Sequence, residues 1–267
     1  MYFITFSRKA GANGTAIAKL VAKELQYAFY DTEDIERKAA EMGFLDDVRE
    51  VNDKMPPPFR RFFSYRTEVS LDRLYAVIYE LARQGSAILL GRGGNMLLRS
   101  LPYALHVRIT ASREKRIQSL AERGYSREDA LLVMQKSDHE REGFVKFAFR
   151  RNWDNSELYD LVLNTDNFSV SAAAAVILAA VRARENWQSG GNAANALALM
   201  ELAVKVRAAL VQAGFPAGYI SSFVAAPGKV CLTGVVQVPW EKSEAERSVL
   251  AVAGVKIVEN RIEIAGR

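Results

Sequence analysis

A loop of small residues near the N-terminus has the composition and spacing of a phosphate-binding site. Residues 7–14 read Ser-Arg-Lys-Ala-Gly-Ala-Asn-Gly, between an apolar β-branched stretch and a segment whose apolar residues have helical spacing. Backbone N–H groups in such a loop point inward, the helix N-terminus is partly positive, and small side chains let phosphate come close. The same residues also fit a plain strand-to-helix turn. The candidate phosphate-binding residues are Gly11, Ala12, Asn13, Gly14 and Thr15.

The loop lacks the lysine of the common pattern G-x-x-x-x-G-K-[ST]. With the helix start aligned, Asn13 stands at the lysine position and Gly14 at the hydroxyl position. Thr15, one position later, becomes the candidate Mg²⁺ ligand. Arg8 and Lys9 at the loop entrance are candidates to replace the missing positive charge, although both also fit solvated surface charges.

Arg92 is a further cation with a defined place in the chain. It follows residues 87–90, a continuous apolar run of the kind found in central strands, after a single glycine. Ligands of α/β proteins bind at the carboxyl ends of parallel strands. Because the guanidinium group matches phosphate geometry, we predict that Arg92 contacts a phosphoryl group.

These residues need a scaffold that brings strand ends together. Residues 2–6 predict a first strand, the apolar spacing of residues 17–25 predicts a helix, and residues 27–31 predict a second strand ending in Asp31. This order indicates a parallel α/β sheet. Further strands are predicted over 87–90, 106–109 and 161–165, and further helices over 32–52, 69–83, 112–151 and 170–181.

A smaller module follows a linker. Residues 188–192 read Gln-Ser-Gly-Gly-Asn, which is flexible and lacks apolar periodicity. The segments beyond it predict an α+β module with helices over 196–212 and 241–252 and strands over 229–236 and 255–264. We therefore predict one domain over 1–187, a linker over 188–196 and a second domain over 197–267.

Composition excludes several classes of chemistry. The 267 residues include one cysteine, Cys231, and two histidines far apart in sequence. These counts exclude an internal disulfide and argue against a metal site rich in cysteine or histidine. The net charge of +5 is divided as +3 over residues 1–187 and +2 over residues 188–267, with no basic tail. Nucleic acid is therefore not an expected partner.

The sequence also bears on location. Residues 1–6 predict a strand rather than a signal peptide. The most apolar run, over 170–181, is shorter than the ~20 residues that a bilayer requires. We expect a cytoplasmic protein, which agrees with a lone reduced cysteine.

Several motifs in order resemble the cytidylate kinase-like family of P-loop proteins. Residues 4–18, with the loop at their centre, are similar to the family's I-S-R-x-x-G-S-G-G-x-x-I-A, and residues 29–31 match its F-Y-D. That family commonly lacks the loop lysine, and the resemblance covers roughly residues 1–182. The other matching motifs are Gly91-Arg92-Gly93, Ser-Arg-Glu-Asp-Ala at 126–130, Asp138-x-x-Arg141, Trp153 and residues 159–165.

The resemblance implies a P-loop kinase-like parallel sheet flanked by helices. It implies that ATP binds at the loop, that an insertion binds the acceptor, and that a lid closes with arginines. The implied reaction is Mg²⁺-dependent transfer of the γ-phosphoryl group from ATP to a nucleoside monophosphate, CMP- or dCMP-like. Leu90 and Gly93 stand where cytidylate kinases carry the aspartates of D-G-R-D, so the acceptor base stays open.

The resemblance also assigns residue roles. The lid region contains Asp138, Arg141 and Arg150, and the acceptor region contains three arginines around an aromatic cluster. These arginines also fit charged helix faces, and Asp31 also fits a helix cap. The candidate catalytic residues are Arg8, Lys9, Arg92, Asp138, Arg141 and Arg150. The candidate substrate-binding residues are Asp31, Arg60, Arg61 and Arg66.

Residues 197–267 resemble a BON domain. Residues 228–235 are similar to the family pattern G-x-V-x-L-x-G-x-V, and residues 252–262 to V-x-G-V-x-x-V-x-N. The resemblance implies a regulatory or ligand-binding module. BON modules are also linked to membrane association, often outside the cytoplasm. Because the sequence shows no export signal, we do not expect that association here; this module is the one part that could provide it.

Three functions remain open on the sequence. The first is a nucleoside monophosphate kinase with an appended BON-like module. The second is a catalytically inactive nucleotide sensor, because the loop lysine and both aspartates are absent. The third is a membrane- or ligand-binding protein in which the BON-like part dominates.

Overall fold

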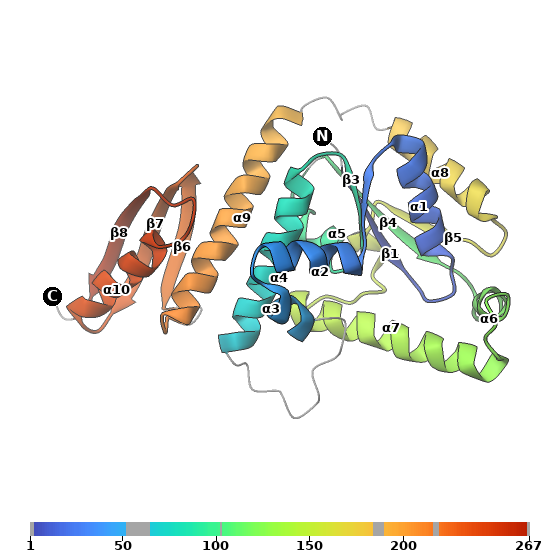
Figure 1. The fold of residues 1–267 in the computed structure, drawn as a ribbon, viewed down its shortest axis with the longest axis horizontal. Helices are drawn as coiled ribbons and strands as arrows, with labels where there is room; N and C mark the ends of the chain where they lie inside the picture. The colour runs from blue at the N-terminus through green and yellow to red at the C-terminus, as the bar shows by residue number, and fades with distance from the viewer. Residues whose placement is uncertain (1–2, 52–64, 102, 184–189, 216–218, 266–267) are drawn as a thin grey trace. The chain divides into compact units, whose positions relative to one another are not determined.

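The computed structural model describes residues 3–51, 65–101, 103–183, 190–215 and 219–265, without the side chains of 65–67 and 190–193. These residues form two compact units (Figure 1). The first unit contains the described residues of 3–35 and 84–193. The second contains those of 36–51, 65–83 and 194–265. The boundary falls inside helix α2 (Thr32–Glu41).

The first unit is built on a parallel five-stranded sheet of order β2-β3-β1-β4-β5. Its central strands are almost fully buried because helices cover both faces. The strands are β1 (Phe3–Arg8), β2 (Ala28–Tyr30), β3 (Ala87–Leu90), β4 (Ala104–Thr110) and β5 (Leu161–Asn164). The helices are α1 (Gly14–Leu25), α5 (Gly94–Leu97), α6 (Arg113–Ala121), α7 (Arg127–Phe149), the 3₁₀ helix η2 (Ser156–Leu158) and α8 (Val170–Ala183).

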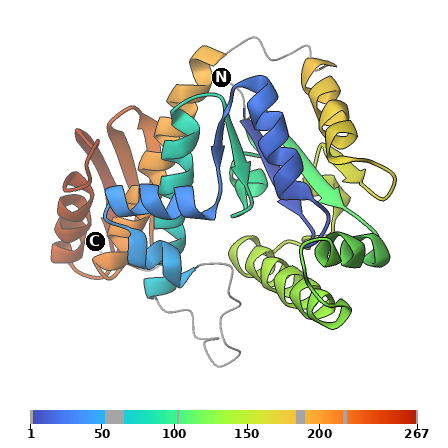
Figure 2. The same ribbon diagram turned by 45° about the vertical axis from the view of Figure 1, so that its right-hand side comes forward.

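Helices α1 and α8 pack together against the sheet, as both ribbon views show (Figure 2). The helical spacing of Ile17 and Val21 puts both side chains on the buried face of α1. They meet Ile4 and Phe6 of β1 in one apolar core. This core fixes the carboxyl end of β1, from which the glycine-rich loop leaves.

The second unit contains a smaller sheet of order β6-β7-β8. Strand β6 runs antiparallel to β7, with a register irregularity between Val224 and Ala226, and β8 runs parallel to β7. The elements are α3 (Leu45–Glu50), α4 (Tyr65–Arg83), α9 (Gly190–Gln212), β6 (Ile220–Ala226), β7 (Lys229–Val236), α10 (Pro239–Leu250) and β8 (Ile257–Ile264). Side chains from α9, α10 and the three strands share one apolar core.

The predicted α/β fold with an added α+β module is confirmed, and several boundaries differ. The predicted helix over 112–151 is two helices, because Gly124 takes φ +92° and Ser126 caps α7 by accepting the N–H of Asp129 at 3.0 Å. Strand β6 is absent from the sequence prediction, since two serines and the exposed Phe223 obscure its alternation. Helix α9 begins at Gly190, inside the predicted linker.

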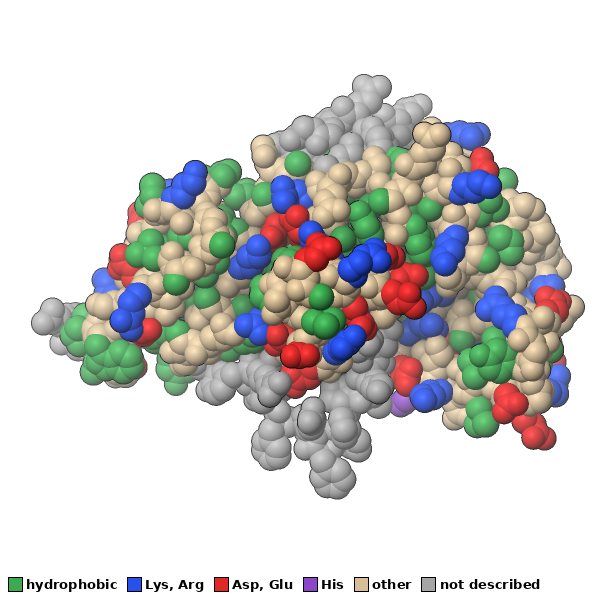
Figure 3. All heavy atoms as spheres, in the orientation of Figure 1, with side chains coloured by type: hydrophobic (Ala, Val, Ile, Leu, Met, Phe, Trp, Pro, Cys, Tyr) green, Lys and Arg blue, Asp and Glu red, His purple; other side chains and the backbone are tan. Residues whose placement is uncertain are grey.

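Charge and hydropathy are distributed along the described residues as follows. On the face drawn in Figure 3, basic and acidic side chains are interspersed rather than segregated. Among the described helices, none combines the length and hydropathy needed to cross a bilayer.

Candidate functional site

The glycine-rich loop connects the carboxyl end of β1 to the start of α1. Its backbone turns through two left-handed residues, Gly11 (φ +79°) and Asn13 (φ +58°). The N–H of Gly91, just after β3, donates to the carbonyl of Phe6 at 2.9 Å. The loop and the Gly91-Arg92-Gly93 turn therefore lie at neighbouring strand ends, where α/β proteins bind ligands.

Helices α6 and α7 hold the loop in place. The N–H of Ala10 donates to Asp138 Oδ1 at 3.0 Å, and Arg116 Nε donates to the carbonyl of Ala10 at 2.6 Å. Arg116 and Asp138 also form an ion pair with each other. Asp138 therefore orders the loop, while Arg141 Nη1 lies 3.7 Å from the same Oδ1 atom. Sequence reasoning selected Asp138 and missed Arg116, which is one of the few buried arginines.

The side chain of Asn13, which stands at the position of the missing lysine, is engaged by residues outside the loop. Its Oδ1 accepts hydrogen bonds from Ser119 Oγ at 2.8 Å and from the guanidinium of Arg123. The Asn13 side chain thus fastens the start of α1 to α6. Any positive charge for a phosphate must come from other side chains.

Three arginines line one cavity of about 30 Å³ beside the loop: Arg8, Arg92 and Arg141. They arrive from the end of β1, the turn after β3 and helix α7, so only the fold brings them together. A buried water needs about 10–15 Å³. The cavity is thus large enough for water but too small for a phosphoryl group, which can enter only if surrounding side chains move. The other lining residues are Ser7, Gly91, Gly93, Asn95, Phe144, Val145 and Trp153.

The turn that carries Arg92 is backbone-strained. Gly91, Arg92 and Gly93 take φ of +85°, +53° and +68° in succession. A left-handed non-glycine residue costs energy and persists where its surroundings enforce it. A Cβ on Gly91 would lie 2.7 Å from Arg8 Nη1, and one on Gly93 would collide with the ring of Phe149. The two glycines therefore permit close packing, which keeps Arg92 only 3% exposed.

A second polar cluster supports the wall of the cavity. Trp153 Nε1 donates to Ser7 Oγ at 2.9 Å, and the guanidinium of Arg108 lies 4.2 Å from the centre of the Trp153 ring. Arg108 also pairs with Asp154, whose Oδ1 lies 3.4 Å from Lys9 Nζ. Lys9 is thus engaged with Asp154, whereas Arg8 lines the cavity. Arg108 and Asp154 were missed because their partners are more than 40 positions away in sequence.

The remaining predicted residues lie elsewhere. Asp31 caps α2, because its Oδ1 accepts the N–H of Glu33 at 3.0 Å, as its helix-cap alternative predicts. Thr15 is exposed on the first turn of α1, and Arg150 is exposed at the left-handed C-cap of α7. Arg60 and Arg61 lie outside the described residues, as does the side chain of Arg66 in α4.

The residues of the site bear on both groups that the reaction would need, ATP phosphates and Mg²⁺. Three guanidinium groups and a glycine-rich turn fit an anion. For the metal, the described residues contain no group of three or more His, Cys, Asp or Glu side chains. This does not conflict with Mg²⁺, which commonly takes one or two protein ligands and completes its shell with phosphates and water. Thr15 stays the candidate ligand.

Replacing Gly11 with alanine is expected to lower the free energy of unfolding by about 1–3 kcal/mol. A Cβ there would lie 2.7 Å from the carbonyl oxygen of Arg116, so the loop and α6 must separate. Gly124→Ala is the matched control, because Gly124 also has positive φ (+92°) but open space around its Cβ position. Urea denaturation measures both variants. Equal losses would show that backbone strain alone, not the contact with α6, sets the cost.

Comparison with known proteins places this geometry in context. A BON domain model matches residues 200–266. A solved structure of an uncharacterized protein from Eubacterium ventriosum is similar with a TM-score of 0.55 and 18% identity, covering 68% of this chain and 99% of that chain. A shikimate kinase from Bacteroides thetaiotaomicron gives a TM-score of 0.40 and 10% identity, covering 68% and 98%. No curated protein matches the sequence.

The family model that spans most of the first unit also covers every motif that places a side chain at the cavity. It matches residues 3–167, from the start of β1 to just beyond β5. These residues include the loop, the Arg92 turn and α7. The chain therefore belongs to the cytidylate kinase-like family.

Proposed function

We propose that this protein transfers the γ-phosphoryl group of ATP to a nucleoside monophosphate, CMP- or dCMP-like. The observation that carries the proposal is the convergence of Arg8, Arg92 and Arg141 on one cavity beside the glycine-rich loop. Phosphoryl transfer depends mainly on positioning and on neutralising charge on the transferred group. An array of guanidinium groups from two strand ends and helix α7 is suited to both tasks.

Each part of the site has a distinct task under this proposal. Backbone N–H groups of residues 11–15 bind donor phosphates, since no lysine does so. Arg8, Arg92 and Arg141 neutralise the phosphoryl oxygens and orient them. Asp138 does not touch the substrate in this scheme, but positions the loop through Ala10 and keeps Arg141 close. Mg²⁺, when bound, would screen phosphate charge, with Thr15 as its candidate protein ligand.

The domain and acceptor assignments extend the proposal. We assign catalysis to residues 1–187 and a regulatory or ligand-binding role to residues 197–267, with 188–196 as the linker. Asp31, Arg60, Arg61 and Arg66 are the proposed acceptor-side residues. Asp31 can both cap α2 and face an acceptor, because its cap uses only one carboxylate oxygen.

A coupled assay of ADP formation tests the proposal. The full-length protein, ATP and Mg²⁺ are combined with a panel of CMP, dCMP, UMP, AMP, GMP and shikimate. ADP release that depends on CMP or dCMP is the expected result. ATP hydrolysis at the same rate without any acceptor would contradict it.

The inactive nucleotide sensor is the competing function, and the engagement of Asn13 with α6 favours it. Thermal unfolding with ATP separates the two. Ligand binding to the native state adds RT ln(1 + [L]/Kd) to the free energy of unfolding and so raises the melting temperature. Stabilisation by ATP without acceptor-dependent ADP release would replace the kinase with the sensor.

A further inference from the structure

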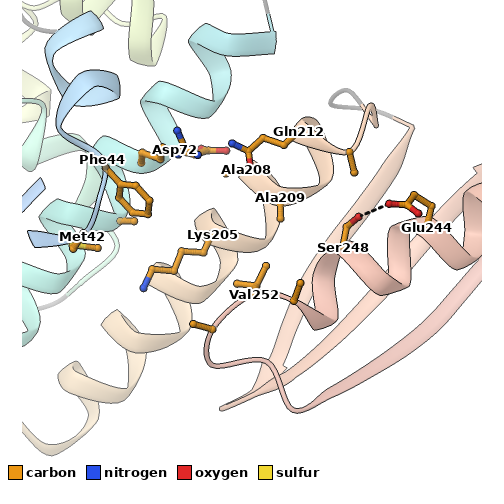
Figure 4. A pocket seen from close by; sticks show the side chains of 15 residues that line it. Met42, Phe44, Asp72, Lys205, Ala208, Ala209, Gln212, Glu244, Ser248 and Val252 are labelled. Atoms are coloured by element: carbon orange, nitrogen blue, oxygen red, sulfur yellow. Dashed lines mark hydrogen bonds between the residues drawn. The ribbon is translucent and has the colours of Figure 1, made fainter. Parts of the chain in front are cut away.

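The second unit contains a cavity of about 680 Å³ that the kinase chemistry does not use. Its walls come from the turn between α2 and α3, helix α4, helix α9, and helix α10 with the turn that follows it (Figure 4). All of these segments belong to the second unit. Small-molecule sites typically enclose about 300–1,000 Å³. The cavity therefore has the size of a ligand site.

Small side chains line one side of this cavity and leave its volume open. Helix α9 presents Lys205, Ala208, Ala209 and Gln212 on the cavity side, at the spacing of one helix face (Figure 4). The facing walls add further apolar side chains, including Phe44. Because alanine side chains are short, the α9 side of the cavity leaves space for the apolar part of a ligand to pack against it. Burial of that body would supply most of the binding free energy.

The acidic side chains of the cavity are already engaged. Asp72 accepts a hydrogen bond from Arg207 Nε at 2.7 Å and is paired with the same guanidinium through its other oxygen. Glu244 is paired with Arg247 and accepts a bond from Ser248 Oγ at 3.3 Å. Neither carboxylate is therefore well placed to bind a cationic ligand.

The basic side chains keep donor capacity. Arg73 pairs with Asp47 through one terminal nitrogen, which leaves further N–H groups of its five. Its guanidinium lies 5.2 Å from the centre of the Phe44 ring, beside the apolar wall. Lys205 binds Glu201 and has three N–H donors in all. Arg73 and Lys205 therefore each have more N–H groups than these contacts occupy, beside an apolar wall.

We propose that this cavity binds a small amphipathic anion: a compact aromatic or aliphatic body that carries a carboxylate, sulfonate or phosphate. The body lies against Phe44 and the alanines of α9, and the anionic group accepts hydrogen bonds from Arg73 and Lys205. The site requires residues from both family segments, 3–167 and 200–266, so neither segment forms it alone. The proposal is independent of kinase activity.

Fluorescence titration of the full-length protein with anilinonaphthalene sulfonate, an aromatic sulfonate, tests this site without nucleotide. Ala209→Phe fills the cavity from α9, and Ala253→Phe fills it from the exposed turn after α10. Lys205→Gln removes a donor. The matched controls are Ala225→Phe and Lys256→Gln, at exposed positions of the same unit outside the cavity. Far-UV circular dichroism checks that each variant folds.

We expect the dye Kd to rise at least tenfold in either filling variant and about fivefold in Lys205→Gln, with less than a twofold change in the controls. In thermal unfolding, phenyl phosphate and phenylbutyrate should raise the melting temperature, and phenethylamine should not. Unchanged dye affinity in the filling variants that fold, or equal stabilisation by the amine, would overturn the proposal.

Discussion

Arg92→Ala is expected to lower kcat/KM for phosphoryl transfer by about 10²–10³-fold, because one preorganised charge-assisted contact in a water-poor site is worth about 2.7–4 kcal/mol. Arg92 is 3% exposed and shares its cavity with Arg8 and Arg141. Steady-state kinetics with the best acceptor of the panel measures the loss. Arg92→Lys should recover only part of it, since an ammonium cannot reproduce the planar fork of donors.

Arg182→Ala is the matched control for this experiment. Arg182 is exposed in the last turn of α8, and its replacement should leave kcat/KM unchanged. Melting temperatures verify that all three variants fold. A folded Arg92→Ala enzyme that keeps its kcat/KM within threefold of the wild type would remove Arg92 from the catalytic set.

Arg207→Ala is expected to lower the free energy of unfolding by about 3 kcal/mol at pH 7, because it leaves a buried carboxylate without its counter-charge. The Asp72 side chain is only 4% exposed and bonds to two nitrogens of Arg207. Urea denaturation measures the loss. Arg261→Ala, which breaks an exposed pair with Glu259, should cost much less, because solvent screens that pair.

The destabilisation should depend on pH in a defined direction. Burial raises the pKa of Asp72 above its usual 3.8, whereas Arg207 opposes that rise. A raised pKa means that the folded state binds the proton more tightly, so the Asp72 contribution to stability is largest below pH 3.8 and falls as pH rises through the folded-state pKa. Without Arg207, the folded-state pKa of Asp72 rises further.

The loss caused by Arg207→Ala should therefore be larger at pH 7 than at pH 5. Asp72→Asn removes the carboxylate, so adding Arg207→Ala to it should cost much less than Arg207→Ala alone. Burial also raises the pKa of Tyr75 and Tyr79, which face the same pair, and both stay neutral in this range. A loss that is the same at both pH values would contradict the assigned role of Asp72.

Local patterns determined much of the first unit. The apolar run at 87–90 is strand β3, and the spacing of Ile17 and Val21 marks the buried face of α1. Local apolar periodicity predicts which side chains are buried, and this prediction does not require knowing which segment packs against them. For the same reason, a cation directly after a central strand could be selected as a site residue, and Arg92 does line the cavity.

Long-range partners could not be predicted in this way. Arg116 bonds to the carbonyl of Ala10, 106 positions away, and Trp153 bonds to Ser7, 146 positions away. Asn13 was selected for its backbone N–H, and the sequence did not show that its side chain bonds to Ser119 and Arg123. A polar side chain has several possible partners, and only the packed chain decides among them.

The sequence by itself therefore determined the two family segments, the parallel sheet and the loop at its edge. It also singled out Arg8, Arg92 and Arg141, because strand ends and helix motifs are local features. Only the tertiary structure decided that these arginines share one cavity and that Asp72 of α4 pairs with Arg207 of α9. The physical reason is that an amphipathic pattern shows only that a face must be buried. Which segment buries it depends on the shape and the buried charges of both surfaces, which the folded chain brings together.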